Sequence, residues 1–574
     1  MNLEKGYYFN WKINLSPKDK IFKLSFALNI ISPIANVLYN RGYINAEKAQ
    51  EFLFPIYDPK VYHAKNLDSA ELAVERILQA IDNKEKILIS GDYDVDGMTS
   101  TSLLLYALLE FGADVNFFLP NRERDGYGLT VKIINKALKN NYGLVITVDN
   151  GTSAHEALEF AKINNIDVIV TDHHQPKESL PDGALYIVNP HKSNCKYAFK
   201  DLAGVGVIFK VVSLLYEKYN KKIPEKIYEL FMLGTIADVV PLVSENRYWI
   251  SHCLSNVNLN KSYYLNILKE NAKISSETPL TSTDIAFYIA PQLNALGRMD
   301  DARNGVLFLI SDDKDEIEQI GKQIFDTNKK RKKVEHDIFE KIINEINKSE
   351  IDPQQYGCLI KVGKDYPIGL IGLISAKISH LYGVPSFIFS ETDKGLLKGS
   401  ARSIPEINIF DCISKISPGL LISFGGHGGA AGLSLKKEDL NQFEKEISNI
   451  ILSNYSKDDL TKKIIIDSIL DVDEINEKLW NDLKLLEPFG ACNSIPIFCI
   501  RNIQIKDVVI LKDLHVKATI QSDKNFCSII FFNKPELYNI LKTINTTIDV
   551  LAKVVQNNWN NKSKIELIGI DIKI

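Results

Sequence analysis

The chain has 574 residues, of which 45% are hydrophobic and 24% are charged, and its formal net charge is −4. This length exceeds what one core supports, so we expect two to four domains. No stretch reaches the apolar length of a membrane helix and the first residues lack a signal-peptide pattern, which predicts a soluble cytoplasmic protein with no membrane partner. The seven cysteines include no Cys-x-x-Cys pair, which argues against a disulfide framework or a thiolate zinc site. The charge argues weakly against coating nucleic acid by bulk electrostatics but leaves room for a local basic channel.

The first 310 residues divide into two expected units. Residues 1–70 predict an N-terminal helical segment with a packing role, with helical patterns at 35–41 and 46–53. Residues 71–310 predict an α/β domain, because apolar runs alternate with helical patterns up to about 245 and the rest reads as helical. The strands expected in its parallel sheet are 86–90, 114–119, 144–148, 167–171 and 184–188, and helices such as 98–111 and 153–163 separate them.

Three further units are expected beyond residue 310. Residues 311–351 are charged with few breakers, which predicts a connecting helix over 313–349. Residues 352–455 predict a smaller α/β domain. Its elements are strands at 357–362 and 386–390, a helix at 369–381 and a Gly-rich turn at 425–432. Residues 456–574 predict a small β-barrel of the OB type, with strands at 463–469, 495–500, 508–511, 517–520, 526–532, 548–554 and 565–574.

Carboxylates and imidazoles follow the ends of three predicted strands of the first sheet. Ligands collect at the carboxyl ends of parallel strands, so these side chains are expected to converge. Asp238 stands in an otherwise apolar run, and buried acids are rare unless they are paired or bound to metal. The side chains at the strand ends are Asp92, Asp94, Asp96, Asp149, Asp172, His173 and His174.

Such a cluster suits Mn²⁺ or Mg²⁺, because hard cations prefer oxygen ligands and Mn²⁺ also accepts imidazole. Without a cation the carboxylates would repel one another and their pKa values would rise. A calcium loop of the EF-hand type is the rival for Asp92-x-Asp94-x-Asp96-Gly97. That rival fails because a strand precedes the motif and the distal Glu between two helices is missing.

Two of these signals have a simpler explanation when taken alone. Asp149 precedes Asn150-Gly151, which is strong turn chemistry. The basic run at 329–333 is typical of a solvated helix face. The pair His173-His174 is harder to explain structurally, because adjacent imidazoles at a buried strand end need partners that metal and phosphate would supply.

Four short motifs resemble those of the DHH phosphoesterase superfamily, and the whole chain looks like its RecJ branch of bacterial single-strand-specific exonucleases. The motifs are 91–97 (GDYDVDG), 148–151 (VDNG), 171–174 (TDHH) and 237–242 (ADVVPL). Supporting motifs are 122–128, 202–207, 291–298, 369–372, 399–403 and 424–432. The resemblance implies a parallel-sheet DHH domain and a smaller DHHA1-type domain joined by a long helix, plus an OB-like barrel.

The resemblance also implies roles for residues at matching positions. It assigns Asp94, Asp96, Asp149, His173 and Asp238 as core metal ligands and catalytic residues. It places Asp92 and Asp172 in the same metal-binding motifs, either as ligands or as residues that support the ligands, and puts His174 near the scissile phosphate. The residues implied to bind substrate are Arg122, Arg298, Arg331, Ser400, Arg402, Gly426 and His427. For Arg331 this reverses the solvated-face interpretation. Tyr366-Pro367 departs from the family's Trp-His, which puts strand-end contacts there in question.

The activity implied is two-metal, 5′ to 3′ hydrolysis of single-stranded DNA to 5′-mononucleotides in recombination and repair. Single-stranded DNA is the expected ligand, a single-strand-binding protein and a helicase are the expected partners, and the chain is expected to be a monomer. Short-oligonucleotide and cyclic-dinucleotide phosphodiesterases are the nearest alternatives, but they commonly lack an OB-like segment. A non-enzymatic DNA-binding scaffold is disfavoured because every expected ligand is present.

Overall fold

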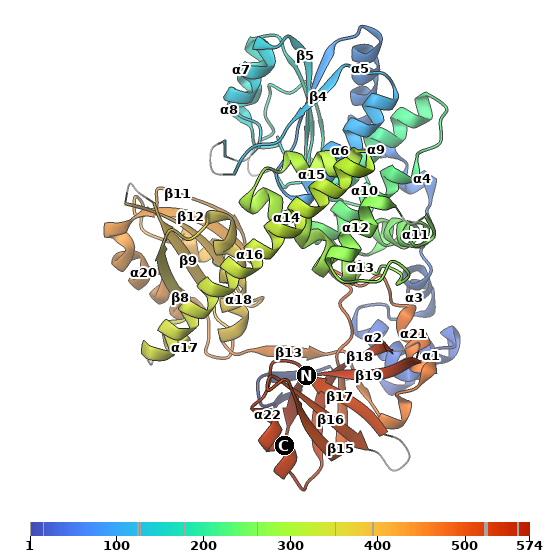
Figure 1. Ribbon diagram of the computed structural model, residues 1–574, viewed down its shortest axis with the longest axis vertical. Helices are drawn as coiled ribbons and strands as arrows, with labels where there is room; N and C mark the ends of the chain where they lie inside the picture. The colour runs from blue at the N-terminus through green and yellow to red at the C-terminus, as the bar shows by residue number, and fades with distance from the viewer. Residues whose placement is uncertain are drawn as a thin grey trace.

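The computed structural model describes residues 2–14, 16–122, 125–126, 128–176, 179–260, 262–349, 352–392, 395–521, 526–559 and 562–574. It has three bodies, seen in Figure 1: a first α/β lobe at the top, a smaller second α/β lobe at the left and a β-barrel at the bottom. The long helix α16 runs between the two α/β lobes. The expected mixture of two α/β domains, a connecting helix and a barrel is confirmed.

A five-stranded parallel sheet forms the first lobe, in the order β4-β3-β5-β6-β7. Its strands are mostly apolar because both faces are covered: Ile87 and Ile89 pack on one side of the sheet and Leu88 on the other. The chain order reverses at β3, where ligands collect in such sheets. All five predicted strands are confirmed, as β3 (Lys86–Ser90), β4 (Val115–Phe118), β5 (Tyr142–Val148), β6 (Asp167–Thr171) and β7 (Tyr186–Val188).

Helices cover both faces of this sheet, and further helices extend the lobe toward the barrel. One face carries α5 (Ala70–Asp82), α6 (Val95–Glu110), α9 (Gly204–Lys218) and α10 (Glu225–Ala237), and the other carries α7 (Val131–Lys139) and α8 (His155–Ile163). The stretch predicted as helical holds α11 (Ser244–Asn260), α12 (Tyr263–Asn271), α13 (Ser282–Asp284), the π-helix η2 (Ile285–Ile289), α14 (Ala290–Met299) and α15 (Arg303–Ile310).

The connecting helix is confirmed as α16 (Lys314–Ser349), whose 36 residues span roughly 54 Å. Its apolar stripe belongs to two cores. Ile317, Ile320 and Ile324 pack in the first lobe, whereas Ile342 and Ile346 pack in the second. One continuous helix therefore fixes the spacing of the two lobes.

The second lobe has a five-stranded sheet in the order β11-β12-β10-β9-β8, in which only β8 and β9 run parallel. The expected Gly-rich turn at 425–432 is wrong in extent, because most of it lies in two paired strands. Tyr366 is buried with its ring against Gly363, so the departure from the family motif fills core space. The elements are α17 (Pro353–Tyr356), β8 (Leu359–Lys364), α18 (Ile368–Tyr382), β9 (Ser386–Glu391), β10 (Leu396–Arg402), α19 (Ile409–Ser414), β11 (Ser423–His427), β12 (Ala430–Lys436) and α20 (Leu440–Asn454).

The barrel closes because β15 pairs with both β16 and β18. Two predicted strands, 495–500 and 508–511, are one bent strand, since an irregularity after Ile500 lets it leave β18 and join β16. The predicted strand 463–469 is divided at Asp467, and two helices were not predicted. The elements are β13 (Lys463–Ile466), β14 (Ser468–Leu470), α21 (Glu477–Lys484), β15 (Phe498–Leu511), β16 (His515–Gln521), β17 (Phe526–Phe531), α22 (Leu537–Thr543), β18 (Ile548–Trp559) and β19 (Lys562–Lys573).

The N-terminal segment packs on this barrel and starts with two strands that were not predicted. Trp11 is fully buried, and its Nε1 donates a hydrogen bond to Asp571 at 2.7 Å. Helical residues such as Leu38 and Phe52 share a core with the barrel. We call residues 2–54 and 463–574 together the OB unit. Its N-terminal elements are β1 (Asn2–Lys5), β2 (Asn10–Ile13), α1 (Lys18–Leu28), α2 (Ser32–Asn40) and α3 (Ala46–Leu53), and α4 (Pro59–Tyr62) leads to the first lobe.

Among the described helices, no single one is long and apolar enough to cross a membrane. The bent pair α1 and α2, at 111° to each other, passes a test of length and composition alone.

Asp571 gives a test of the OB unit. Its carboxylate accepts hydrogen bonds from Trp11 Nε1 and from the backbone N–H groups of Tyr8 and Phe9. We expect Asp571→Ala to lower the free energy of unfolding of the barrel by roughly 3 kcal/mol, because buried donors lose a charged acceptor. Calorimetry would measure this as a lower barrel transition. The exposed Asp507 on β15 is the control, and an equal loss in Asp507→Ala would contradict the assignment.

Candidate metal centre

The first motif bends from strand β3 directly into helix α6. Asp94 caps this helix, because its carboxylate accepts a hydrogen bond from the backbone N–H of Gly97 at 3.0 Å. Gly97 lies against the backbone of Asp92, where a Cβ would come within 2.6 Å of the Asp92 carbonyl oxygen. The tight turn places Asp92, Asp94 and Asp96 at the carboxyl end of the sheet, with Asp92 and Asp96 buried.

Asp96 is held by the N-terminus of helix α9. Its two carboxylate oxygens accept hydrogen bonds from the backbone N–H groups of Gly204, at 2.6 Å, and Val205, at 2.8 Å. A Cβ on Gly204 would come within 2.6 Å of the Cβ of Asp149, so only glycine allows helix and strand end to approach this closely. The stretch 202–207, which the sequence marks only as a supporting motif, thus positions an acid.

His173 brings three acids from different elements together. Its Nε2 lies 3.2 Å from Asp149 at the end of β5, 3.7 Å from Asp238 after α10, and 3.9 Å from Asp96. Asp149 adopts a left-handed backbone with φ of 62°. Among the described residues there are three groups whose donor atoms, within each group, lie within 4.8 Å of one another. They are Asp96, His173 and Asp238; Asp92, Asp94 and Asp149; and Asp149, His173 and His174.

The electrostatics of this cluster fit a divalent cation. Burial and mutual repulsion raise the pKa values of Asp92, Asp149 and Asp238 well above the ordinary range, and burial, with repulsion from Asp94, raises the pKa of Asp96 to about 7. Oδ1 of Asp92 is buried with no hydrogen-bond partner among the described residues. Burial lowers the pKa of His173 to about 4, which keeps the imidazole neutral as a ligand requires. The charge and the protonation states of these donors therefore fit a divalent cation.

Asp172 does not join the donor groups that the described residues form, which favours the alternative that it supports the ligands over its assignment as a ligand. Its Oδ1 accepts hydrogen bonds from Nδ1 of His174 at 2.7 Å and from two backbone N–H groups, and its Oδ2 accepts one from Thr152 at 2.9 Å. These bonds hold its pKa at about 2 despite burial. Burial lowers the pKa of His174, but the bond to Asp172 outweighs it and the net pKa is raised. Asp172 therefore orients the His174 ring and favours its protonated form.

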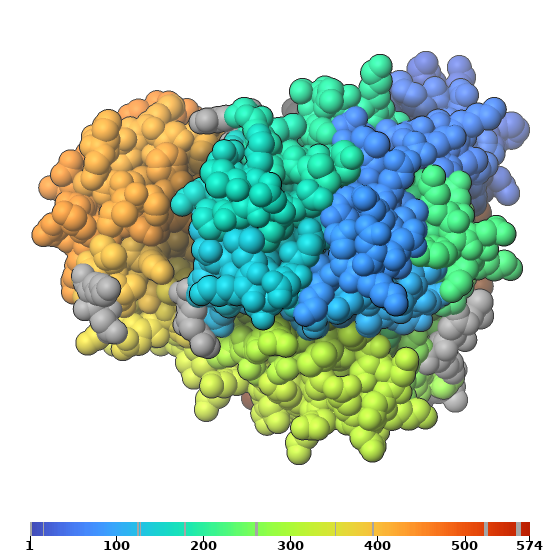
Figure 2. Space-filling view, turned by 90° about the horizontal axis from the view of Figure 1, so that it is seen from above, coloured from blue at the N-terminus to red at the C-terminus, as the bar shows by residue number. Residues whose placement is uncertain are grey.

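A cluster of arginines lies beside the acids, between the two α/β lobes, which stand side by side in Figure 2. Arg298 of α14 donates a hydrogen bond to the carbonyl of Gly369 in the second lobe at 2.8 Å. Burial, with repulsion from Arg122, lowers the pKa of Arg298 to about 10 and also lowers that of Arg402. Arg402 donates to Ser400 at 3.1 Å. A hollow of about 520 Å³ includes Arg122, Arg298 and Gly369 in its lining.

Arg331, Gly426 and His427 are the remaining residues expected to bind substrate. Arg331 is buried and donates hydrogen bonds to Asn328 and Glu335, whereas the four lysines around it are exposed. Arg331 is also close enough to Arg298 to help lower the pKa of that guanidinium, and the expected phosphate contact through Arg331 stays a prediction. Gly426 and His427 lie on β11, and in the described part of the chain no hydrogen bond or ion pair joins His427 to the arginines. A Cβ on Gly426 would come within 2.3 Å of the Ala430 carbonyl oxygen.

Sequence reasoning missed Tyr93, whose ring lies 4.5 Å from the guanidinium of Arg122. It also missed Asn189, which donates hydrogen bonds to the carbonyl of His174 and to Thr152. Tyr93 stands inside the first motif, so its position was a usable signal. Asn189 follows β7, and only its place at a strand end pointed to it.

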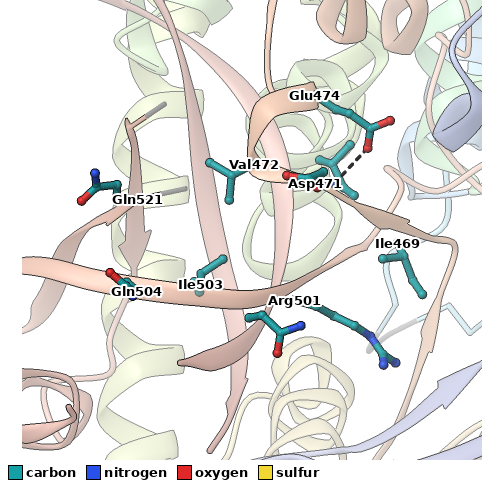
Figure 3. A pocket seen from close by; sticks show the side chains of 10 residues that line it. Ile469, Asp471, Val472, Glu474, Arg501, Ile503, Gln504 and Gln521 are labelled. Carbon is teal, nitrogen blue, oxygen red and sulfur yellow. Dashed lines mark hydrogen bonds between the residues drawn. The ribbon is translucent and has the colours of Figure 1, made fainter. Parts of the chain in front are cut away.

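A second hollow, of about 500 Å³, lies on the barrel and is shown in Figure 3. Its lining includes Asp471, Glu474, Arg501, Gln504 and Gln521. Asp471 and Glu474 line this hollow, and Arg501 is already paired with Glu4. Among the described lining residues no cation is therefore left to bind a phosphate. Acids also line the inter-lobe hollow (Asp125, Asp300 and Asp301), but three arginines, Arg122, Arg298 and Arg303, stand beside them, so it is the better candidate for a phosphate backbone.

Comparison with known proteins identifies the family. Family models match for the DHH family N-terminal domain over 86–235, the DHHA1 domain over 355–453 and the RecJ OB domain over 466–571. A Bacillus subtilis (strain 168) protein named single-stranded-DNA-specific exonuclease RecJ is 34% identical over 98% of this chain and 71% of its own length. This chain belongs to the RecJ family. A RecJ of the same name from Escherichia coli (strain K12) is 32% identical over 76% of this chain and 78% of that protein.

Solved RecJ structures share the fold. RecJ from Thermus thermophilus in complex with Mn²⁺ has a TM-score of 0.83 at 24% identity, covering 98% of this chain and 79% of that one. An exonuclease RecJ described as bound to manganese has a TM-score of 0.58 at 27% identity, covering 68% of this chain and 96% of that one. The arrangement of both lobes, long helix and barrel is thus that of RecJ.

The raised pKa values predict how the metal-free protein responds to pH. An acid whose pKa is raised on folding stabilises the fold at low pH, and this contribution is lost as pH rises through the raised value. For Asp96 that value is about 7. In a chelator, thermal unfolding should therefore occur at lower temperature at pH 8 than at pH 6, and Mn²⁺ should reverse the loss.

Asp149→Asn is the matched variant, because asparagine is isosteric and tolerates the left-handed backbone. It should show a smaller difference between the two pH values in chelator and a smaller gain with Mn²⁺. Equal unfolding temperatures of the wild type at both pH values would contradict the proposed repulsion.

Proposed function

We propose that this RecJ-family chain hydrolyses single-stranded DNA from its 5′ end, releases 5′-mononucleotides, and acts in DNA recombination and repair. The observation that carries the proposal is the position of the acidic cluster directly beside the inter-lobe arginines. Relatives that are 34% and 32% identical bear the name single-stranded-DNA-specific exonuclease. The polarity and the product are the parts of the proposal that these names do not state.

The proposed metal ligands are Asp94, Asp96, Asp149, His173 and Asp238, with Asp92 beside them. Mn²⁺ or Mg²⁺ suits these oxygen and imidazole donors, and a relative is described as bound to manganese. Divalent cations in such a site supply Lewis-acid charge for hydrolysis of a phosphodiester. Asp149 and His173 each belong to two of the donor groups, and Asp149 has two carboxylate oxygens, so it is the better placed of the two to serve both halves of a two-metal site.

His174 would act on the scissile phosphate. Asp172 accepts a hydrogen bond from its Nδ1, which leaves Nε2 as the nitrogen that can donate to a phosphate oxygen. The raised pKa keeps the ring protonated nearer to neutral pH, so it can stabilise negative charge that develops on that oxygen. Asp172 is a positioning residue in this proposal.

The arginines would bind the backbone of the strand. Arg122 repels both Arg298 and Arg402, and a phosphate between them would relieve that repulsion. Ser400 supports Arg402, and Gly426 and His427 would contact the strand farther along the second lobe. Phosphate contacts predict weak sequence preference and strong salt dependence. All proposed ligands come from one chain, so we propose a monomer. A helicase and a single-strand-binding protein would supply and hold its substrate.

Digestion of a long single-stranded DNA labelled at either end tests the function, with Mn²⁺ and with a duplex and a dinucleotide alongside. We expect rapid release of the 5′ label from the long single strand alone, falling steeply as salt rises. Preference for the dinucleotide would reassign the chain to the oligonucleotide phosphodiesterases. Binding without hydrolysis in metal-replete buffer would favour a scaffold.

His173→Ala tests the ligand set. We expect a loss of hydrolysis of roughly 10²- to 10³-fold with DNA binding retained, because the change removes a ligand and no phosphate contact. His191→Ala is the control, since His191 is half-buried near the same strand ends but belongs to none of the donor groups of the described residues. Full turnover by the His173 variant would refute the assignment.

A further inference from the structure

The turn that follows Asp238 is strained. Val239 has a left-handed backbone with φ of 60°, and its side chain is 67% exposed. A β-branched residue in this region is an outlier that costs about 1–3 kcal/mol, and such strain persists only where the surroundings impose it. Helix α10 supplies one constraint, because Asp238 and Val239 donate backbone hydrogen bonds to its last carbonyls. The other constraint must lie on the far side of the turn.

That constraint comes from the OB unit. The backbone N–H of Leu242 donates a hydrogen bond to the carbonyl of Ala491 at 3.0 Å. The Leu242 side chain is buried against Gly490. A Cβ added to Gly490 would come within 2.6 Å of Cδ1 of Leu242. Ser282 of the first lobe also donates to the carbonyl of Phe489, at 2.7 Å. We call residues 485–493 the docking loop.

Arg247 also forms hydrogen bonds with the docking loop. The residue is 1% exposed, and its guanidinium donates hydrogen bonds to the carbonyls of Leu485, Leu486 and Glu487 at 2.7 to 3.1 Å, just past the end of helix α21. It also donates to the carbonyl of Phe52 and lies 3.9 Å from the centre of the Phe52 ring. A cation near the carboxyl end of a helix is favoured by the helix dipole. Arg247 thus ties the first lobe to both halves of the OB unit.

Residues 238–247 therefore run without a break from the metal centre into the OB unit. Val243 packs against the core of the first lobe and also against the core of the OB unit. Ser244, at the start of α11, is a second left-handed residue, with φ of 49°. A short segment with strain near both ends and anchors at Leu242 and Arg247 has little freedom to move independently of the docking loop.

We propose that docking of the OB unit through Leu242 and Arg247 sets the position of Asp238, so that this unit tunes metal binding besides any contact with DNA. Arg247 is a positioning residue in this scheme. The inference rests on the proposed function only in taking Asp238 as a metal ligand. Asp94, Asp96, Asp149 and His173 are held within the first lobe, so release of the joint weakens the site without abolishing it.

Calorimetric titration of Mn²⁺ into the full chain without DNA tests the proposal. We expect Arg247→Met to weaken Mn²⁺ binding about 10-fold, the effect typical of residues that orient ligands. The kcat on a dinucleotide, too short to reach the barrel, should fall as well. Gly490→Ala, which pushes Leu242 away, is a second variant should Arg247→Met fail to fold.

Arg501→Met is the matched control. Arg501 is an arginine of β15 that donates a hydrogen bond to Glu4, so this contact lies inside the OB unit and outside the docking loop. The change should leave Mn²⁺ affinity unchanged. The proposal is overturned if Arg247→Met and Gly490→Ala bind Mn²⁺ normally, whether or not they lose affinity for long DNA, or if Arg501→Met weakens Mn²⁺ binding equally. A wild type that fails to cleave single strands would refute the proposed function and still leave the Mn²⁺ comparison valid.

Discussion

Repulsion among buried carboxylates is the constraint on which the first lobe depends. Each acid of the cluster is held in a different way. Asp94 caps helix α6, Asp96 accepts hydrogen bonds from the N-terminus of α9, Asp149 follows strand β5 and Asp238 follows helix α10. These rigid supports hold like charges together at the expense of raised pKa values. Without these backbone contacts the carboxylates would move apart. The contacts therefore keep the carboxylates close enough together to bind cations.

The arginines beside these acids present the opposite problem. Arg122 is close enough to lower the pKa values of Arg298 and Arg402, and the negative charge of Asp94 partly offsets this for Arg298. Cations in the acidic site and phosphates at the arginines would relieve both repulsions at once. Since helix α16 belongs to both lobe cores, the spacing between the two clusters is set by packing and not by the ligands.

The sequence predicted the central sheet and most of the metal cluster, because the ends of parallel strands must meet at one edge. It could not predict features that depend on distant partners. The N-terminal hairpin pairs with β13, more than 400 residues away, and so carried no local signal. Asp172 stands in the ligand motif, yet its backbone position turns it toward His174. Arg331 lies in a basic run, but Glu335 one turn later draws its side chain inward.

The OB unit shows why the chain cannot be divided simply by sequence order. Its two halves come from opposite ends of the chain, and Asp571 joins them through Trp11. The unit then contacts the first lobe through the docking loop, a few residues from Asp238. A module placed at the end of the sequence therefore contacts the segment that leads from Asp238. The OB unit and the acidic cluster consequently share one joint, and in the scheme proposed above a change at that joint acts on metal binding.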